Sequence, residues 1–140
     1  MDSQYVTMLF AVWDDNTRRL EVANAGSVQP LIARGKSVET IGVEGFPLGL
    51  FPNATYDGMT LTLEPGDIVA FFSDGITDAE DQQQDMFGSE RLAEVIARQP
   101  RTASAQTVMN SILKSVEQFQ NGVEHFDDET IVVMRATSSK

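Results

Sequence analysis

Hydrophobic and polar positions alternate along much of the first half of the chain, a pattern that is typical of β-strands. The stretch YVTMLFAVW at 5–13 is rich in β-branched and aromatic residues, and it predicts a buried strand. Turn-forming residues follow it. In the stretch 18–25, Leu20, Val22 and Asn24 alternate with other residues, so this stretch is expected to return as the second strand of a hairpin.

Two more hairpins are predicted downstream. The segment 30–41 contains the first of them, with the residues RGK as its turn. The stretches 59–63 and 68–72, joined by the turn residues EPGD, are expected to form the second. Because IVAFF at 68–72 is apolar without interruption, it indicates a central strand that is covered on both faces.

Helical spacing of apolar residues begins near residue 89. The stretch 89–99 places Leu92, Val95 and Ile96 on one helical face, with Ser89 as the expected N-cap. The interruption at Pro100 ends this helix.

A second helix and a last strand complete the pattern. The stretch 104–119 is expected to be helical, and TIVVMR at 130–135 to be an apolar strand. The order of strands, then two helices, then a strand predicts an α+β fold. The second helix carries apolar residues at helical spacing: Val108, Ile112, Val116 and Phe119.

Length and composition narrow the class of protein. A chain of 140 residues corresponds to one domain, and no apolar run approaches the roughly 20 residues of a membrane-spanning helix. The absence of cysteine excludes disulfides and thiolate metal sites, and the start of the chain lacks the basic region of a signal peptide. A net charge of −11 disfavours binding to nucleic acid, which depends on Lys and Arg contacts to phosphates.

Carboxylates follow or precede two of the predicted apolar strands. Asp74 and Gly75 come soon after the strand at 68–72, and Asp127 and Asp128 come shortly before the last strand. If these strands are antiparallel neighbours, their carboxylates converge at one edge of the sheet. Converging carboxylates repel one another unless a cation such as Mg²⁺ or Mn²⁺ binds between them. This pattern therefore indicates a candidate metal site.

The same residues also have a purely structural interpretation. Asp-Gly is a common turn dipeptide, and acidic residues stabilise the N-terminal ends of helices. The residues DGITDAED do not match the EF-hand calcium loop. Spacing alone therefore leaves both a metal site and a simple turn open.

Four segments, taken together and in order, resemble the metal-dependent PPM-type (protein phosphatase 2C-like) serine/threonine phosphatases. They are ANAGSVQPLIARG, PLGLFPNATYDGMTLTLEPGDIVAFFSDGITDAED, MFGSERL and DDETIVVMR. The closest branch is the stage II sporulation protein E type, which regulates bacterial anti-sigma systems. The resemblance covers about 5–136, so residues 1–140 are expected to form a single partial domain of this type. It implies a β-sandwich flanked by helices, truncated at its N-terminal side.

The resemblance also implies roles for particular residues. Asp74 matches the Asp of the family's SDG motif, and Asp127 matches the first Asp of its DDxT motif, so both are expected to be metal ligands. Asp78 and Asp128 are expected to be accessory to the metal centre. Gly75 is expected to let the backbone pass close to the site.

Members of this family use two Mg²⁺ or Mn²⁺ ions and a metal-activated water to hydrolyse phosphoserine or phosphothreonine. The resemblance implies that the substrate is a phosphorylated protein, in this branch typically an anti-sigma-factor antagonist. The absence of cysteine and of a basic signal-peptide region fits a cytoplasmic protein. No contact with nucleic acid or membrane is expected from this chain.

The chain also departs from the family pattern. It lacks the early GD-x-SGHG motif that supplies a bridging Asp, and its one histidine is His125. Ser27 stands where the branch usually has His, and Glu129 where an apolar residue is commoner. The chain is therefore expected to be a piece of a longer protein, with weak or no activity alone.

Two further expectations follow from these departures. A sandwich without its first strands exposes apolar surface and strand edges, so the chain is expected to form a homo-oligomer. The alternative to an enzyme is a non-catalytic pseudophosphatase or partner-binding module that keeps the fold.

Overall fold

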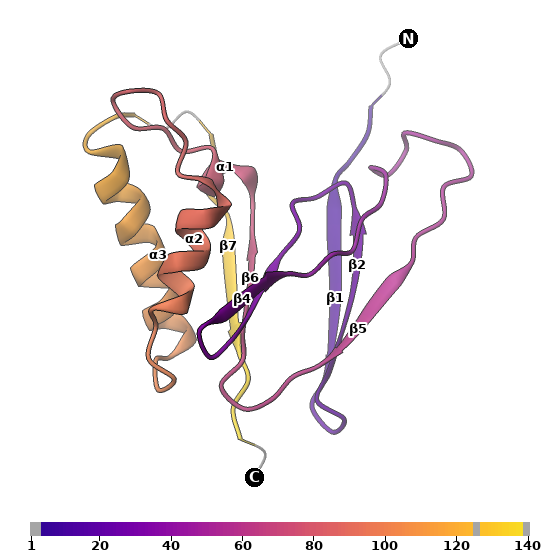
Figure 1. The fold of residues 1–140 in the computed structure, drawn as a ribbon. Helices are drawn as coiled ribbons and strands as arrows, with labels where there is room; N and C mark the ends of the chain where they lie inside the picture. The colour runs from indigo at the N-terminus through magenta and orange to yellow at the C-terminus, as the bar shows by residue number, and fades with distance from the viewer. Residues whose placement is uncertain (1–3, 125–126, 139–140) are drawn as a thin grey trace. The chain divides into compact units, whose positions relative to one another are not determined.

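The computed structural model describes residues 4–124 and 127–138 of the chain. These residues form two antiparallel sheets and three helices, which confirms the α+β class (Figure 1). The chain divides into two compact units. The first unit combines Met1–Gln29 with Ile41–Glu64, and the second combines Pro30–Thr40 with Pro65–Lys140.

The sheet of the first unit has the strand order β1-β2-β5. β1 (Met8–Asp14) pairs antiparallel with β2 (Arg19–Ala25), which confirms the first predicted hairpin. β2 also pairs antiparallel with β5 (Gly58–Thr62). Leu20 and Val22 on β2 are buried, as their alternation with other residues predicts.

The prediction that the stretch 5–13 is a buried strand is wrong. β1 is an edge strand of its sheet, and Met8, Phe10 and Val12 are 47%, 57% and 47% exposed. These three residues alternate along the strand and so share one face. The apolar composition of β1 therefore does not reflect burial within the first unit.

Asp14 closes the turn between β1 and β2. Its carboxylate accepts hydrogen bonds from the backbone N–H groups of Thr17 and Asn16, at 3.2 and 2.9 Å. These bonds, that of Thr17 first, favour the ionised form and lower the pKa of Asp14. The stability that this turn gains from ionisation is present above the unfolded-state pKa and is lost as the pH falls through the lowered value.

Asn24, at the end of β2, is a buried polar residue that organises the loop after the strand. Its side-chain amide donates to the carbonyl oxygens of Ser27 and Val43, at 3.0 and 3.1 Å. Its carbonyl oxygen accepts from the backbone N–H of Ser27 at 2.8 Å. Because its side chain is fully hydrogen-bonded, its burial at 2% exposure is not penalised.

The sheet of the second unit has the strand order β4-β3-β6-β7. The predicted hairpin in 30–41 is confirmed as β3 (Leu31–Arg34) and β4 (Ser37–Thr40), with Gly35 at a positive φ in the turn. β6 (Ile68–Phe72) lies between β3 and β7 (Ile131–Arg135), both antiparallel to it. β6 is therefore central, as predicted.

The third predicted hairpin, between 59–63 and 68–72, is wrong. β5 pairs with β2 in the first unit, whereas β6 pairs in the second. The residues EPGD between them do form a turn, but that turn connects two sheets. A turn signal and strand propensity therefore give the two strands correctly without giving their partners.

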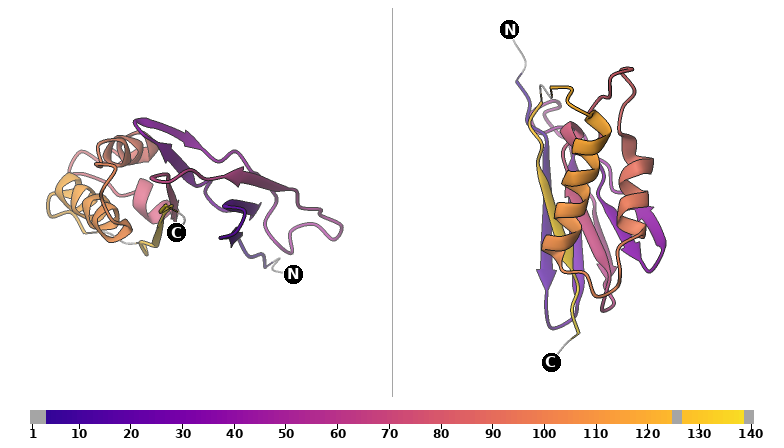
Figure 2. Two further views of the ribbon diagram at one scale, coloured as in Figure 1. Left: turned by 90° about the horizontal axis from the view of Figure 1, so that it is seen from below. Right: turned by 90° about the vertical axis from the view of Figure 1, so that its left-hand side faces the viewer.

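Helices α2 (Gly88–Ala97) and α3 (Ala105–Gln120) lie side by side against one face of the second sheet (Figure 2). Both predicted apolar stripes point into this core, with Phe119 half-buried against it. The fully buried members include Ile68 and Ala70 of β6, and the helical residues Leu92, Val95, Ile96, Val108, Ile112 and Val116.

The predicted N-cap of the first long helix is wrong, whereas the second long helix has clear caps. α2 begins at Gly88, one residue before Ser89, and its N-cap position is Phe87, without a side-chain cap. Ser104 caps α3 by accepting from the backbone N–H of Thr107 at 3.1 Å. α3 ends at Gln120, and its C-cap residue Asn121 is in the left-handed conformation.

A buried ion pair stands at the start of β6. Asp67 is 1% exposed, and Arg34 from the end of β3 donates from Nη2 to Oδ2 at 2.6 Å. Nε of Arg34 also donates to Oδ1 and Oδ2 at 3.1 and 3.2 Å. This fork satisfies the charge of Asp67, so a carboxylate can be buried beside the central strand.

None of the helices in the described part of the chain is long and apolar enough to cross a membrane.

Replacing Leu92 with alanine tests the core between the helices and the second sheet. Leu92 is 0% exposed, so its loss is expected to lower the free energy of unfolding by about 2–5 kcal/mol, measured by chemical denaturation. Leu50→Ala is the matched control. Leu50 is 40% exposed, and its loss is expected to change stability by about 0.5 kcal/mol or less. Equal losses for the two variants would contradict this description of the core.

Candidate metal centre

The end of β6 and the start of β7 lie at the same edge of the second sheet. The two strands are antiparallel, and Phe72, the last residue of β6, pairs with Ile131, the first residue of β7. The short helix α1 (Asp74–Thr77) begins just after β6, beside the segment that leads into β7 (Figure 1). The pairing therefore brings the Asp74 segment and the 127–130 segment together.

Ser73 joins these two segments through three hydrogen bonds. Its backbone N–H donates to the carbonyl oxygen of Thr130 at 2.9 Å. Its Oγ accepts from the backbone N–H of Thr130 at 3.0 Å and donates to the carbonyl oxygen of Asp128 at 3.2 Å. Ser73 thus extends the β6–β7 ladder by one residue and ties the backbone just before Asp74 to Asp128 and Thr130.

Gly75 is in close contact with the same segment. A Cβ atom on this residue would lie 2.2 Å from the carbonyl oxygen of Asp128. Real Cβ atoms do not approach backbone oxygens so closely, so a side chain here would push the two segments apart. The close approach expected around Gly75 is thus present between α1 and the 127–130 segment.

The four candidate carboxylates are all exposed. Asp74 is in the first turn of α1, and its carbonyl oxygen accepts from the backbone N–H of Asp78 at 2.7 Å. Asp127 accepts from the backbone N–H of Asp128 through Oδ1 at 2.9 Å. The carboxylates therefore stand on backbone that is hydrogen-bonded on both segments, with side chains open to solvent.

The carboxylate oxygens at this site are of the type that a hard divalent cation binds, but too few of those in the described residues gather at one point to hold such an ion. Carboxylate oxygens are the ligands that Mg²⁺ and Mn²⁺ prefer. Within 4–124 and 127–138, however, no three Asp, Glu, His or Cys side chains gather closely enough to hold a metal ion. The described residues can supply part of a ligand set from two sides, and further ligands have to come from elsewhere.

Sequence reasoning assigned no role to Ser73 or Thr130. Ser73 is the first residue of the SDG motif and Thr130 is the last of the DDxT motif, so these motifs are the signal in the sequence that could have pointed to them. Ser27, by contrast, lies in the first unit, where Asn24 holds its loop. His125 lies outside the described residues.

Two curated proteins are similar to the chain over most of its length. Protein IcfG from Synechocystis sp. is 28% identical over 134 residues, which are 94% of this chain and 21% of that protein. Phosphoserine phosphatase RsbU from Bacillus subtilis is 26% identical over 135 residues, which are 95% of this chain and 39% of that protein. The chain thus spans well under half the length of either relative.

Solved structures show the same fold. The phosphatase domain of the cell fate determinant SpoIIE from Bacillus subtilis, presoaked with Mn, matches with a TM-score of 0.75 and 18% identity, covering 96% of this chain and 58% of that one. RsbX in complex with magnesium matches with a TM-score of 0.62 and 14% identity, covering 91% and 54%. The chain therefore has the fold of PP2C-type phosphatase domains.

The family model of stage II sporulation protein E (SpoIIE) matches residues 1–137, nearly the entire chain. The chain belongs to the SpoIIE family.

Replacing Gly75 with alanine tests the contact between α1 and the 127–130 segment. The new Cβ would overlap the carbonyl oxygen of Asp128, so the variant is expected to lose about 1–3 kcal/mol of stability in chemical denaturation. Gly42→Ala is the matched control, because a Cβ there meets no atom within 4 Å. If Gly75→Ala is as stable as Gly42→Ala, the close approach does not exist in solution.

Proposed function

We propose that this chain is part of a metal-dependent phosphoprotein phosphatase that hydrolyses phosphoserine or phosphothreonine. The observation that carries the proposal is the junction at Ser73, which holds the Asp74 segment against the segment of Asp127 and Asp128 at one sheet edge. Membership of the SpoIIE family supports the same chemistry. The proposal includes the assignment of residues 1–140 to a single domain, which is part of a complete phosphatase domain.

In the proposed site, Asp74 and Asp127 are the metal ligands contributed by this chain. Asp78 and Asp128 orient water or ligands around them, and Gly75 lets the two backbone segments meet. Two Mg²⁺ or Mn²⁺ ions in the complete domain would activate water and neutralise charge on the phosphoryl oxygens. The exposure of the carboxylates supports access for a phosphorylated side chain on a protein surface.

The proposed substrate is a phosphorylated protein of a bacterial signalling pathway, such as an anti-sigma-factor antagonist. RsbU, a phosphoserine phosphatase, and the cell fate determinant SpoIIE are the similar proteins that support this assignment. The proposal includes a cytoplasmic location for the reaction.

One observation favours a second candidate function, a non-catalytic pseudophosphatase or partner-binding module. In the described part of the chain, no cluster of three metal-ligating side chains is present. A module of this kind would keep the fold and the Ser73 junction without binding a metal. The two functions differ in whether Mn²⁺ binds at Asp74.

Thermal unfolding with and without Mn²⁺ tests the ligand role of Asp74. A ligand that binds only the folded state raises the unfolding temperature, so Mn²⁺ is expected to stabilise the chain. Asp74→Asn is expected to abolish most of this shift, because it removes a charged oxygen ligand. Phosphate release from a phosphoserine peptide by this chain is expected to be weak or absent.

Asp57→Asn is the control for that measurement. Asp57 is exposed and lies in the first unit, so its replacement removes the same charge without touching the proposed site. The Mn²⁺ shift should survive in this variant. An equal Mn²⁺ shift in wild type and Asp74→Asn would refute the ligand role of Asp74, and no shift at millimolar Mn²⁺ would mean that this chain alone does not assemble the site.

We also propose that the chain forms a homo-oligomer through β1. The free edge of β1 and its exposed row of Met8, Phe10 and Val12 support this association. Light scattering at high concentration is expected to give a mass above that of one chain, and Phe10→Ser is expected to lower it. A single-chain mass at all concentrations would contradict this prediction.

A further inference from the structure

A hollow of about 620 Å³ lies in the second unit, between the β3–β4 turn and the end of α2. Its walls are Gly35 and Lys36 from the turn and Ala97–Arg101 from the end of α2 and the loop that follows. We call it the basic hollow. Three of its seven lining residues are cationic, and none is acidic: Lys36, Arg98 and Arg101.

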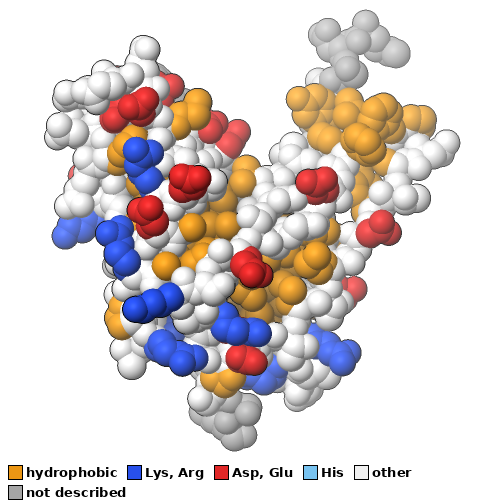
Figure 3. All heavy atoms as spheres, in the orientation of Figure 1, with side chains coloured by type: hydrophobic (Ala, Val, Ile, Leu, Met, Phe, Trp, Pro, Cys, Tyr) orange, Lys and Arg blue, Asp and Glu red, His pale blue; other side chains and the backbone are white. Residues whose placement is uncertain are grey.

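This concentration of positive charge contrasts with the composition of the chain. The chain has 21 acidic against 10 basic residues, and three of those ten line the basic hollow. In the left-hand part of Figure 3, most blue side chains lie toward the lower end, whereas the red ones, with some blue among them, lie over the upper half. Positive charge on an acidic protein is therefore gathered at one end of this unit.

Internal ion pairing does not account for these three cations. The buried carboxylate Asp67, which belongs to the same unit, forms its ion pair with Arg34, and Arg34 does not line the hollow. Among the described residues, the structure records no ion pair or side-chain hydrogen bond for Lys36, Arg98 or Arg101. All three are exposed, so their charges are available to a ligand.

Helix capping explains Arg98 alone. Arg98 occupies the C-cap position of α2, where a cation is favoured by the negative end of the helix dipole. Lys36 lies in a hairpin turn, and Arg101 lies in the loop before α3. Neither of these positions needs a cation for the fold.

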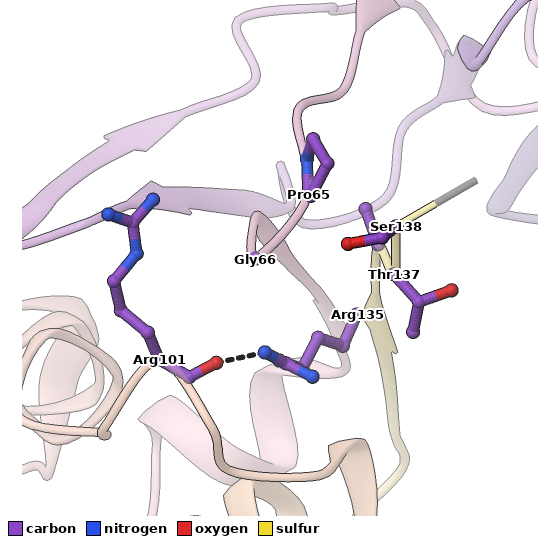
Figure 4. Close-up of a pocket in the computed structure, with 7 residues that line it drawn as sticks. Pro65, Gly66, Arg101, Arg135, Thr137 and Ser138 are labelled. Atoms are coloured by element: carbon purple, nitrogen blue, oxygen red, sulfur yellow. Dashed lines mark hydrogen bonds between the residues drawn. The ribbon is translucent and has the colours of Figure 1, made fainter. Parts of the chain in front are cut away.

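The loop that carries Arg101 is braced from its other side. Arg135 at the end of β7 donates a hydrogen bond from Nη2 to the carbonyl oxygen of Arg101, while the guanidinium of Arg101 points away from that bond (Figure 4). Arg101 also lines a second hollow of about 290 Å³, with Gly66 and Arg135 among its walls. The backbone of Arg101 is thus held in place and its side chain left free.

We propose that the basic hollow is a docking site for an acidic segment of a partner protein. Its volume is far larger than an inorganic anion needs and lies in the usual range of ligand sites. Ala97 and Pro100 give it apolar wall between the charges, which suits a peptide with both carboxylates and apolar side chains.

This docking site is separate from the proposed metal centre. Asp74 follows the last residue of β6, whereas the basic hollow lies at the end of the second unit where β6 begins, about 17 Å away along a strand of five residues. Binding there needs neither a metal nor catalysis. It can therefore be measured, and can fail, independently of the phosphatase chemistry.

Fluorescence anisotropy with a labelled Glu-rich peptide that also carries leucines tests the proposal on the chain without metal. Arg101→Gln is expected to weaken binding roughly two- to fivefold, and the triple variant Lys36→Gln/Arg98→Gln/Arg101→Gln by about tenfold or more. Added salt is expected to weaken the wild-type complex, because exposed charges are screened. Thermal unfolding checks that each variant is folded.

Lys114→Gln is the matched control, because Lys114 is exposed on α3, outside the basic hollow, and its replacement removes the same charge. It should leave peptide affinity unchanged. The proposal is overturned if Lys114→Gln weakens binding as much as Arg101→Gln, or if the peptide does not bind at low salt. It is also overturned if inorganic phosphate or a single-stranded oligonucleotide displaces the peptide more effectively than an unlabelled acidic peptide does.

Discussion

The antiparallel pairing of β6 with β7 is the interaction on which the second unit depends. β6 is buried along most of its length and pairs with β3 on one side and β7 on the other. A slip of one residue in the β6–β7 register would turn the apolar set of β7 to the opposite face and move Asp74 away from the 127–130 segment. The register that fills the core is thus also the register that brings the acidic segments together.

The two ends of β6 carry opposite chemistry. At its C-terminal end, hydrogen bonds of the Ser73 hydroxyl and a glycine without room for a side chain hold exposed carboxylates on adjoining segments. At its N-terminal end, one carboxylate is buried and neutralised, and the surrounding loops present cations. A single short strand therefore separates an acidic edge from a basic one within the same unit, and each edge can serve a different kind of ligand.

Local sequence signals predicted the elements better than their partners. The strands of both real hairpins and the two long helices follow from alternation, turn residues and helical spacing, because these depend on neighbours in the chain. The pairing of β5 with β2 does not follow from such signals, because β3 and β4 lie between these two strands in the sequence. β1 was misjudged because an apolar edge strand and an apolar buried strand have the same composition.

In the candidate site, too, some features follow from local sequence signals and others only from the structure. The meeting of the Asp74 and Asp127 segments could be predicted, because each segment adjoins an apolar strand and the prediction required only that β6 and β7 be neighbours. Ser73 lies within a recognisable motif, but the sequence does not show what it binds, because its hydrogen bonds join residues more than fifty positions apart. The number of metal-ligating groups was equally beyond reach, since it depends on side-chain positions in space.

The course of the chain has a consequence for how the protein folds. The polypeptide enters the first unit, leaves it for β3 and β4, returns for β5, and then completes the second unit. Neither sheet can therefore form from one continuous stretch, and both depend on contacts between distant parts of the chain, which slow folding. During synthesis, β6 also has to wait for β7 before its second edge is paired, so the central strand stays open until residues 131–135 have been made.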